Sequence, residues 1–240
     1  MSKSYTTSVA IKRITRDIRE ITQNPLHSNG IYYVPDESDI TVGHALLIGP
    51  KDTPYFGGYF FFRFQFPQNY PFSPPTVTFL TNGDGIRMHP NFYTCGKVCL
   101  SLLNTFSGEP WTACQSLSTI LLSMYTLFTA SPLLNEPLID SSYIGFINDY
   151  TQCIKYASLN IAVCRILNRE IGNVPYDAFW QIIKETFVAN YDELRQIANK
   201  ELIDVPNPSR RLDSFYHFRF IIDYAKVIVL LDEARQKIEV

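Results

Sequence analysis

The pattern of hydrophobic and polar positions begins with an amphipathic helix and continues into a run of strands. Residues 8–23 carry isoleucines at the helical period along one face, and Pro25 ends this helix. Four strand-like segments with glycine- and proline-rich turns between them follow at residues 30–34, 41–48, 59–65 and 76–80. Consecutive strands without intervening helices predict an antiparallel meander, and therefore an α+β fold.

The second half of the pattern predicts helices. Residues 82–112 are mostly irregular, and a loop of this length inside a compact domain is usually functional. Helical spacing returns over 116–128 and over about 144–167. Two further apolar stripes, from Phe179 to Leu194 and from Phe218 to Asp232, flank a break that contains Pro206 and Pro208. Because such stripes need a surface to pack on, we expect a core domain over 8–168 and a C-terminal helical extension over 169–240 packed on it.

Composition narrows the functional classes. Apolar residues make up 46% of the chain, and the formal net charge of −2 argues against a nucleic-acid binder. The first five residues lack the apolar region of a secretory signal, and no apolar run is long enough for a membrane span. The five cysteines are odd in number and show no repeated spacing. We therefore expect a monomer with reduced cysteines in the cytoplasm or nucleus.

The chemistry gathers around one cysteine. His89-Pro90-Asn91 precedes Cys99, and Asn91 lies eight positions before the cysteine. The segment Tyr70-Pro71-Phe72-Ser73-Pro74-Pro75 lies upstream, and Trp111 and Asn135-Glu136-Pro137 lie downstream. This order of motifs over roughly residues 8–168 resembles the ubiquitin-conjugating enzymes, whose cysteine carries ubiquitin as a thioester.

A second resemblance extends to the C-terminus. The long loop over residues 103–111, the segments 150–154 and 161–164, and the stretch from Phe187 to Ala198 look like the long Z-class conjugating enzymes. Relatives of that class are charged by the alternative ubiquitin-activating enzyme and can carry more than one modifier. The sequence alone leaves open whether this chain shares those preferences.

The resemblance implies a role for each residue near the cysteine. Cys99 would accept ubiquitin, or a ubiquitin-like protein, from an activating enzyme and pass it to a lysine or a ligase. No cofactor or metal is expected, since ATP is used by the activating enzyme. Asn91 is the candidate donor to the oxyanion, although an asparagine beside proline also often closes a turn. His89 would brace the loop that holds Asn91, with support from Pro90 and Tyr93.

Glu136 stands at the family's acidic gate position. An attacking lysine has a reference pKa of about 10.4, so only about one in 2500 is neutral at pH 7. A gate must therefore present the amine by position and by exclusion of water, because a carboxylate alone raises the pKa of a lysine. Many relatives carry aspartate here, whereas the Z-class carries glutamate. The alternative is an ordinary acid on a surface loop.

Two surfaces are expected to meet partners. Phe72 lies between prolines that favour an exposed, extended loop, and the family uses this loop to meet ubiquitin ligases. The second ligase loop contains Ala113 but lacks the usual proline before it. The resemblance also implies docking of the activating enzyme on the basic face of the first helix, at Lys12, Arg16 and Arg19. Those charges could equally form a solvated face, and Phe72 could fold back onto the core.

Three rival interpretations remain at this point. A non-catalytic variant of the fold would bind ubiquitin or a ligase, but such variants typically lack the cysteine that is present here. A cysteine hydrolase would need a base near Cys99, and His89 is the nearby candidate by sequence. A zinc site from Cys95, Cys99, Cys114 and His89 would lack a usual ligand spacing. Cys114, Cys153 and Cys164 are expected to be core or subsurface residues.

Overall fold

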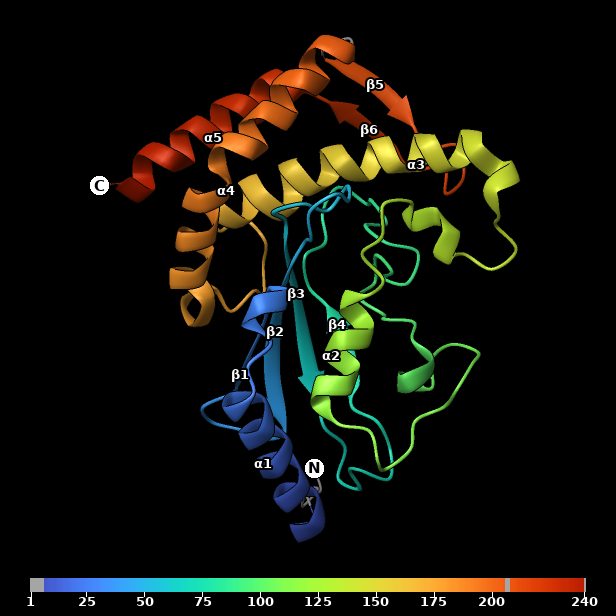
Figure 1. Cartoon of the computed structure of the whole chain (residues 1–240), viewed down its shortest axis with the longest axis vertical. Helices are drawn as coiled ribbons and strands as arrows, with labels where there is room; N and C mark the ends of the chain where they lie inside the picture. Colours follow the sequence, from blue (N-terminus) through green and yellow to red (C-terminus); the bar gives the residue numbers. More distant parts are fainter. Residues whose placement is uncertain (1–6, 206–207, 240) are drawn as a thin grey trace.

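The computed structural model describes residues 7–205 and 208–239. The expectations for the first five residues and for Pro206 fall outside this range. The elements lie along one long axis, with α1 (Ser8–Gln23) at one end and the main sheet in the middle (Figure 1). The C-terminal helices and a small hairpin lie at the other end of the sheet, opposite α1. The α+β fold predicted from the sequence is confirmed.

The helix α1 has the predicted bounds but a slightly rotated buried face. The Thr7 hydroxyl caps it by accepting from the Ala10 N–H at 3.2 Å. Its buried residues are Ala10, Ile14, Asp17 and Ile21. Ile11, which we expected in the core stripe, is 41% exposed. The apolar period was therefore correct, but its centre is shifted by one residue, and a carboxylate occupies a position within it.

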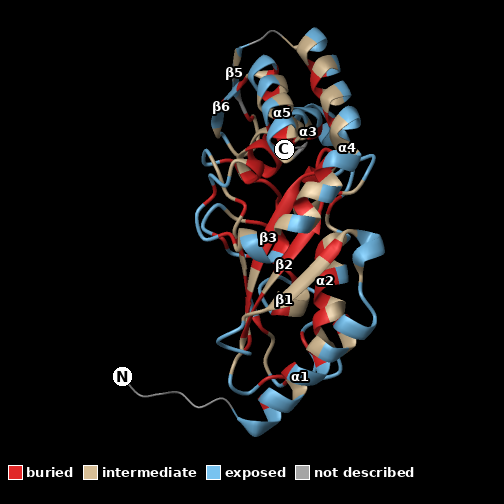
Figure 2. Cartoon of the chain, turned by 90° about the vertical axis from the view of Figure 1, so that its left-hand side faces the viewer, coloured by how far each residue is buried: buried red, intermediate tan, exposed pale blue. Residues whose placement is uncertain are grey.

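The main sheet is the predicted antiparallel meander in the order β1-β2-β3-β4. Its strands are β1 (Ile31–Pro35), β2 (Val42–Ile48), β3 (Tyr59–Gln65) and β4 (Thr76–Phe79). The aromatic run Tyr59–Phe62 is buried on both faces, so β3 lies deep in the core while the edge strand β1 is only partly covered (Figure 2). A continuous hydrophobic run of this kind is typical of a strand that is covered on both sides.

Helical segments follow the irregular region. Helix α2 (Leu117–Tyr125) is shorter than its predicted span and begins with a capping box between Ser116 and Thr119. Helix α3 (Ile144–Ala157) continues into a wider π-helical segment, Ser158–Arg165. Within residues 7–205 and 208–239, no helix has both the length and the apolar character needed to cross a membrane.

The described part of the extension forms two helices and a hairpin. Helix α4 (Tyr176–Asp204) and helix α5 (Tyr224–Glu239) flank β5 (Ser209–Leu212) and β6 (Arg219–Ile222). The predicted second helical stripe was therefore wrong at its start, because Phe218 to Ile222 belong to the hairpin. Alternating exposure along β6, with Phe220 and Ile222 buried and Ile221 exposed, is the period of a strand.

Helix α4 packs directly on the end of the sheet. The Tyr59 hydroxyl donates to the Ile183 carbonyl at 3.0 Å. Gly57 has a φ of +70°, and a Cβ there would lie 2.9 Å from a Leu194 methyl group. Phe179, Ile183, Phe187 and Leu194 join the same buried cluster as the sheet. The exact boundary after residue 168 stays a prediction, but the helices that follow it share the core.

Candidate active site

A short hairpin explains the spacing between Asn91 and Cys99. Phe92 pairs with Val98, and the Tyr93 N–H donates to the Lys97 carbonyl at 2.9 Å. The turn between them needs Gly96, whose φ is +89° and whose added Cβ would lie 2.9 Å from the Thr78 methyl group. One step outward, this register sets Asn91 opposite Cys99.

Asn91 and Cys99 are joined by two hydrogen bonds. The Cys99 N–H donates to the Asn91 carbonyl at 2.8 Å, and Asn91 Nδ2 donates to the Cys99 carbonyl at 2.8 Å. Both residues are buried. The cysteine backbone is therefore fixed at both of its polar groups, and the asparagine amide lies beside the residue that would carry an acyl group.

His89 links this hairpin to the segment that contains Leu127. Its Nδ1 accepts from the Asn91 N–H at 2.9 Å, and its Nε2 lies 3.0 Å from the Leu127 carbonyl. The first bond requires a bare Nδ1, so the ring donates from Nε2. Burial, chiefly, lowers the pKa of His89 to about 3, with a smaller contribution from the nearby Arg87 cation. Both ring nitrogens are occupied and the ring stays neutral, which argues against a hydrolase base.

Arg87 connects this hairpin to Glu136. Its guanidinium donates to the Pro90 carbonyl and lies 3.2 Å from Glu136 Oε1. The same guanidinium stacks on the Tyr93 ring, 3.8 Å from its centroid. Among the described residues, the Tyr93 ring contacts the cations of Arg87 and Lys97, and these contacts are its support of the loop. Pro90, Tyr93 and Glu136 thus converge on one cation.

Tyr216 also reaches Glu136, from the turn between β5 and β6. Its hydroxyl donates to Glu136 Oε1, and its ring also lies against the Arg87 guanidinium, which is 4.6 Å from the ring centroid. Burial raises the pKa of Tyr216, and the bond to the carboxylate adds to this effect. The phenol therefore remains a donor at neutral pH.

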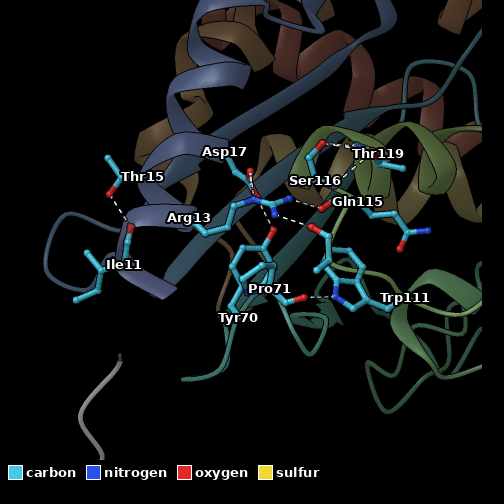
Figure 3. Close-up of polar contacts among 11 residues, drawn as sticks. Ile11, Arg13, Thr15, Asp17, Tyr70, Pro71, Trp111, Gln115, Ser116 and Thr119 are labelled. Carbon is cyan, nitrogen blue, oxygen red and sulfur yellow. Dashed lines mark hydrogen bonds and ion pairs between the residues drawn. The ribbon is translucent and has the colours of Figure 1, made fainter. Parts of the chain in front are cut away.

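The two loops expected to meet ligases are tied to each other and to α1. Trp111 Nε1 donates to the Pro71 carbonyl at 2.7 Å, and Arg13 donates to the carbonyls of Ala113, at 2.7 Å, and of Gln115 (Figure 3). Arg13 also pairs with the buried Asp17 at 2.8 Å, and Asp17 accepts from the Tyr70 hydroxyl. This network fixes the loop backbones while leaving Phe72, 72% exposed, and Ala113 at the surface.

The remaining sequence candidates are dispersed. Lys12, Arg16 and Arg19 are exposed on α1. Cys153 and Cys164 are buried as expected, but Cys114 is exposed, so its expected place in the core or just beneath the surface was wrong. Its loop runs over the surface, where a small side chain need not be covered. Within the part of the chain that the structure describes, no three His, Cys, Asp or Glu side chains are grouped to hold a metal ion.

Comparison with known proteins decides the family. The ubiquitin-conjugating enzyme family model matches residues 13–159, which contain the hairpin, Cys99 and Glu136. The chain belongs to the ubiquitin-conjugating enzymes.

Relatives of one class match beyond this region. Ubiquitin-conjugating enzyme E2 Z of Danio rerio is 40% identical over 80% of this chain and 58% of its own length. The E2 Z proteins of Xenopus tropicalis and Homo sapiens are each 36% identical, over 95% and 94% of this chain and 72% and 63% of their own. The Z-class resemblance is thus confirmed, and the chain spans about three fifths to three quarters of these relatives.

Two residues of this ubiquitin-conjugating enzyme site were missed by the sequence analysis. Arg87 lies two residues before His89, and no motif marks it as a partner of Glu136. Tyr216 lies 80 residues after Glu136 and belongs to a segment that we expected to be a break between helices. The aromatic run around Tyr216 was the available signal, but its partner is set by tertiary packing alone.

Proposed function

We propose that this chain is an active ubiquitin-conjugating enzyme that carries ubiquitin, or a ubiquitin-like protein, as a thioester on Cys99. The observation that carries this proposal is the pair of hydrogen bonds between Asn91 and Cys99. These bonds fix the cysteine backbone beside a neutral amide, in a member of a family named for this activity. The alternative is a non-catalytic variant that binds ubiquitin or a ligase.

Loading is an exchange of thioesters. The Cys99 sulfur attacks the modifier's carbonyl carbon, the new C–S bond forms, and the thiol of the activating enzyme leaves. The exchange needs no base dedicated to Cys99, because the incoming acyl group is already activated. The occupied ring nitrogens of His89 agree with this requirement.

Discharge requires an amine to attack the thioester carbonyl. The amine nitrogen forms the new bond, loses a proton, and the Cys99 thiolate leaves. The attack places negative charge on the carbonyl oxygen, and a positioned amide donor can stabilise that charge. We assign this role to Asn91, whose Nδ2 carries a second N–H besides the one donated to the Cys99 carbonyl.

Glu136 is the group that we propose receives the amine. Arg87 and Tyr216 both contact its Oε1, so the carboxylate is held beside the Pro90 and Tyr93 segment without being sealed in the core. The longer glutamate arm suits this arrangement because it reaches a cation that lies against the hairpin.

The partner surfaces follow from exposure and rigidity. We propose that the exposed Lys12, Arg16 and Arg19 face contacts the activating enzyme, and that Phe72 and Ala113 contact a ligase. Trp111 and Arg13 hold the backbones of these loops in place. A partner would then bind a preformed surface and would not have to order it.

A charging assay with matched cysteine variants tests the proposal. Purified protein, ATP, an activating enzyme and a modifier are combined, and a thiol-sensitive gel shift is read. Cys99→Ala should abolish the shift. Cys95→Ala, which removes the exposed thiol of the same hairpin, should load like the wild type. Thiol-sensitive loading in Cys99→Ala would refute the assignment, and binding of a modifier without loading of the wild type would favour the non-catalytic alternative.

A further inference from the structure

We propose that the C-terminal extension completes the amine gate through Tyr216, a positioning residue that holds Glu136 by one oxygen and leaves the other for the amine. This inference rests on the proposed function. It assigns the extension a part in discharge that its packing on the sheet does not require.

The turn that carries Tyr216 is built to hold a fixed geometry. Asp213 is fully buried, and its Oδ2 accepts from the N–H groups of Phe215, at 3.2 Å, and of Tyr216. The Asp213 N–H donates to the Phe218 carbonyl at 2.9 Å, which closes the turn. The Ser214 hydroxyl donates to Asp149 on α3 at 2.7 Å. The turn is therefore anchored to the core domain next to the gate.

The Tyr216 side chain makes two separable kinds of contact, one through its ring and one through its hydroxyl. Its ring packs against Arg87 and, edge to face, against Tyr150 at 5.4 Å between centroids. Tyr150 in turn donates to the Arg87 carbonyl at 2.7 Å. The Tyr216 hydroxyl, in contrast, donates to Glu136 Oε1. Phenylalanine would retain the ring contacts and remove only the bond to the carboxylate.

Both contacts to Glu136 fall on the same oxygen, Oε1. A glutamate side chain has several rotatable bonds, and the two donors, the Arg87 guanidinium and the Tyr216 hydroxyl, restrict them. Hydrogen bonds to an ionised group are stronger than those between neutral groups, so these two contacts can hold the carboxylate even at a partly exposed site. Oε2 remains to accept an N–H of an incoming amine, in an orientation set by the two contacts.

The test is single-turnover discharge of preloaded protein to free lysine at several lysine concentrations. Tyr216→Phe should lower the second-order rate constant on the order of tenfold, as for loss of one hydrogen bond to a charged group. Loading of Cys99 should not change, because no amine takes part in it.

Tyr191→Phe is the matched control. It also removes one hydroxyl bond to a carboxylate in the extension, since the Tyr191 hydroxyl donates to Asp232 at 2.7 Å. That pair joins α4 to α5. Tyr191→Phe should discharge to lysine at the wild-type rate, whatever small change it makes to the melting temperature.

A double variant separates positioning through Glu136 from a general effect. In a Glu136→Gln background, Tyr216→Phe should cause little further loss, because both changes act on one interaction. Wild-type discharge by Tyr216→Phe, faster discharge, or a full tenfold loss in the Glu136→Gln background would each overturn the inference while leaving the proposed function intact. A wild-type protein that never loads would refute the proposed function itself.

Discussion

Asn91 makes hydrogen bonds to both backbone polar groups of Cys99, at 2.8 Å each. The asparagine carbonyl and the asparagine side chain thus act together on the cysteine. Of the four groups in these two bonds, the Cys99 N–H, the Cys99 carbonyl and the Asn91 carbonyl belong to the backbone. A substitution can therefore remove only the fourth, the Asn91 side-chain amide. The relationship makes Asn91 both a support of the loop and a donor beside the reacting atom.

Replacing Asn91 should separate loading from discharge. Asn91→Ala should still load, because the activating enzyme contributes its own groups, but discharge to lysine should fall by roughly 100-fold if the amide is a direct donor. Single-turnover discharge between pH 7 and 9 measures this. The control is Asn82→Ala, whose Nδ2 also donates to a backbone carbonyl, that of Phe79 at 3.2 Å.

A pH series distinguishes the two roles of Asn91. Raising the pH supplies more neutral lysine to every variant, so a missing oxyanion donor leaves the ratio of variant to wild type constant. A defect much smaller than 100-fold at every pH would instead mean that the side chain only orders the loop.

The buried, neutral His89 should make the protein less stable in mild acid. Its folded pKa, about 3, lies below the unfolded reference of about 6.5, so the unfolded chain binds a proton first as pH falls. The stabilising contribution is complete above about pH 6.5 and is lost toward pH 3. Lowering the pH from 7 to 5 should therefore reduce the unfolding free energy by about 2 kcal/mol through His89.

Urea unfolding at pH 7 and pH 5 checks this contribution. His89→Gln, although less stable at both pH values, should lose about 2 kcal/mol less between them than the wild type. His217→Asn is the control, because His217 is exposed and its φ of +60° suits asparagine. Equal losses in all three proteins would mean that His89 is not held neutral by its burial.

Much of the fold could be predicted because the core elements follow local patterns. The bounds of α1 and β3 match the periodicity, since both carry their own start or stop signals in Thr7, Pro25 and the Gly57-Gly58 turn. The hairpin β5–β6 was missed because its apolar residues, from Phe218 to Ile222, fit a helical stripe and a strand equally well over so short a stretch. Alternating burial, which decides between them, depends on where the hairpin packs.

The residues of the site also fall into a group that the sequence could predict and a group that it could not. His89, Asn91 and Cys99 could be assembled because a short hairpin brings them together from nearby positions. The Arg87, Glu136 and Tyr216 cluster could not, because its members come from three segments that meet only through tertiary packing. Asp17 is a similar case, since a buried carboxylate on an apolar helix face makes sense only once Arg13 and Tyr70 are seen beside it.

The extension should stabilise the core domain through α4. Phe187 is fully buried, so Phe187→Ala should lower the unfolding free energy by about 3–5 kcal/mol. Its neighbour Val188 is 40% exposed, and Val188→Ala should stay within about 0.5 kcal/mol of wild type. Chemical denaturation of both variants gives the comparison, and a Phe187→Ala protein as stable as Val188→Ala would show that α4 packs loosely.

Substitutions of Arg13 and Arg16 should affect different properties although both residues lie on α1. Arg13→Ala leaves Asp17 buried without its cation and releases the Ala113 loop, so stability should fall by about 3 kcal/mol. Arg16 is exposed, and Arg16→Ala should keep the melting temperature but slow loading from the activating enzyme. Thermal unfolding and initial charging rates test both. Normal loading by Arg16→Ala would argue for a solvated face.

The central claim is that Cys99 alone carries the acyl group, and mass analysis of the charged protein tests it most directly. Charging with ATP, an activating enzyme and a modifier should add one modifier mass, removed fully by thiol, and peptide mapping should place the linkage on Cys99. In Cys99→Ser the adduct should be absent or should become an oxyester that resists thiol and yields to alkali. A thiol-labile modifier mapped to Cys95 or Cys114, or one that forms normally in Cys99→Ser, would contradict the account.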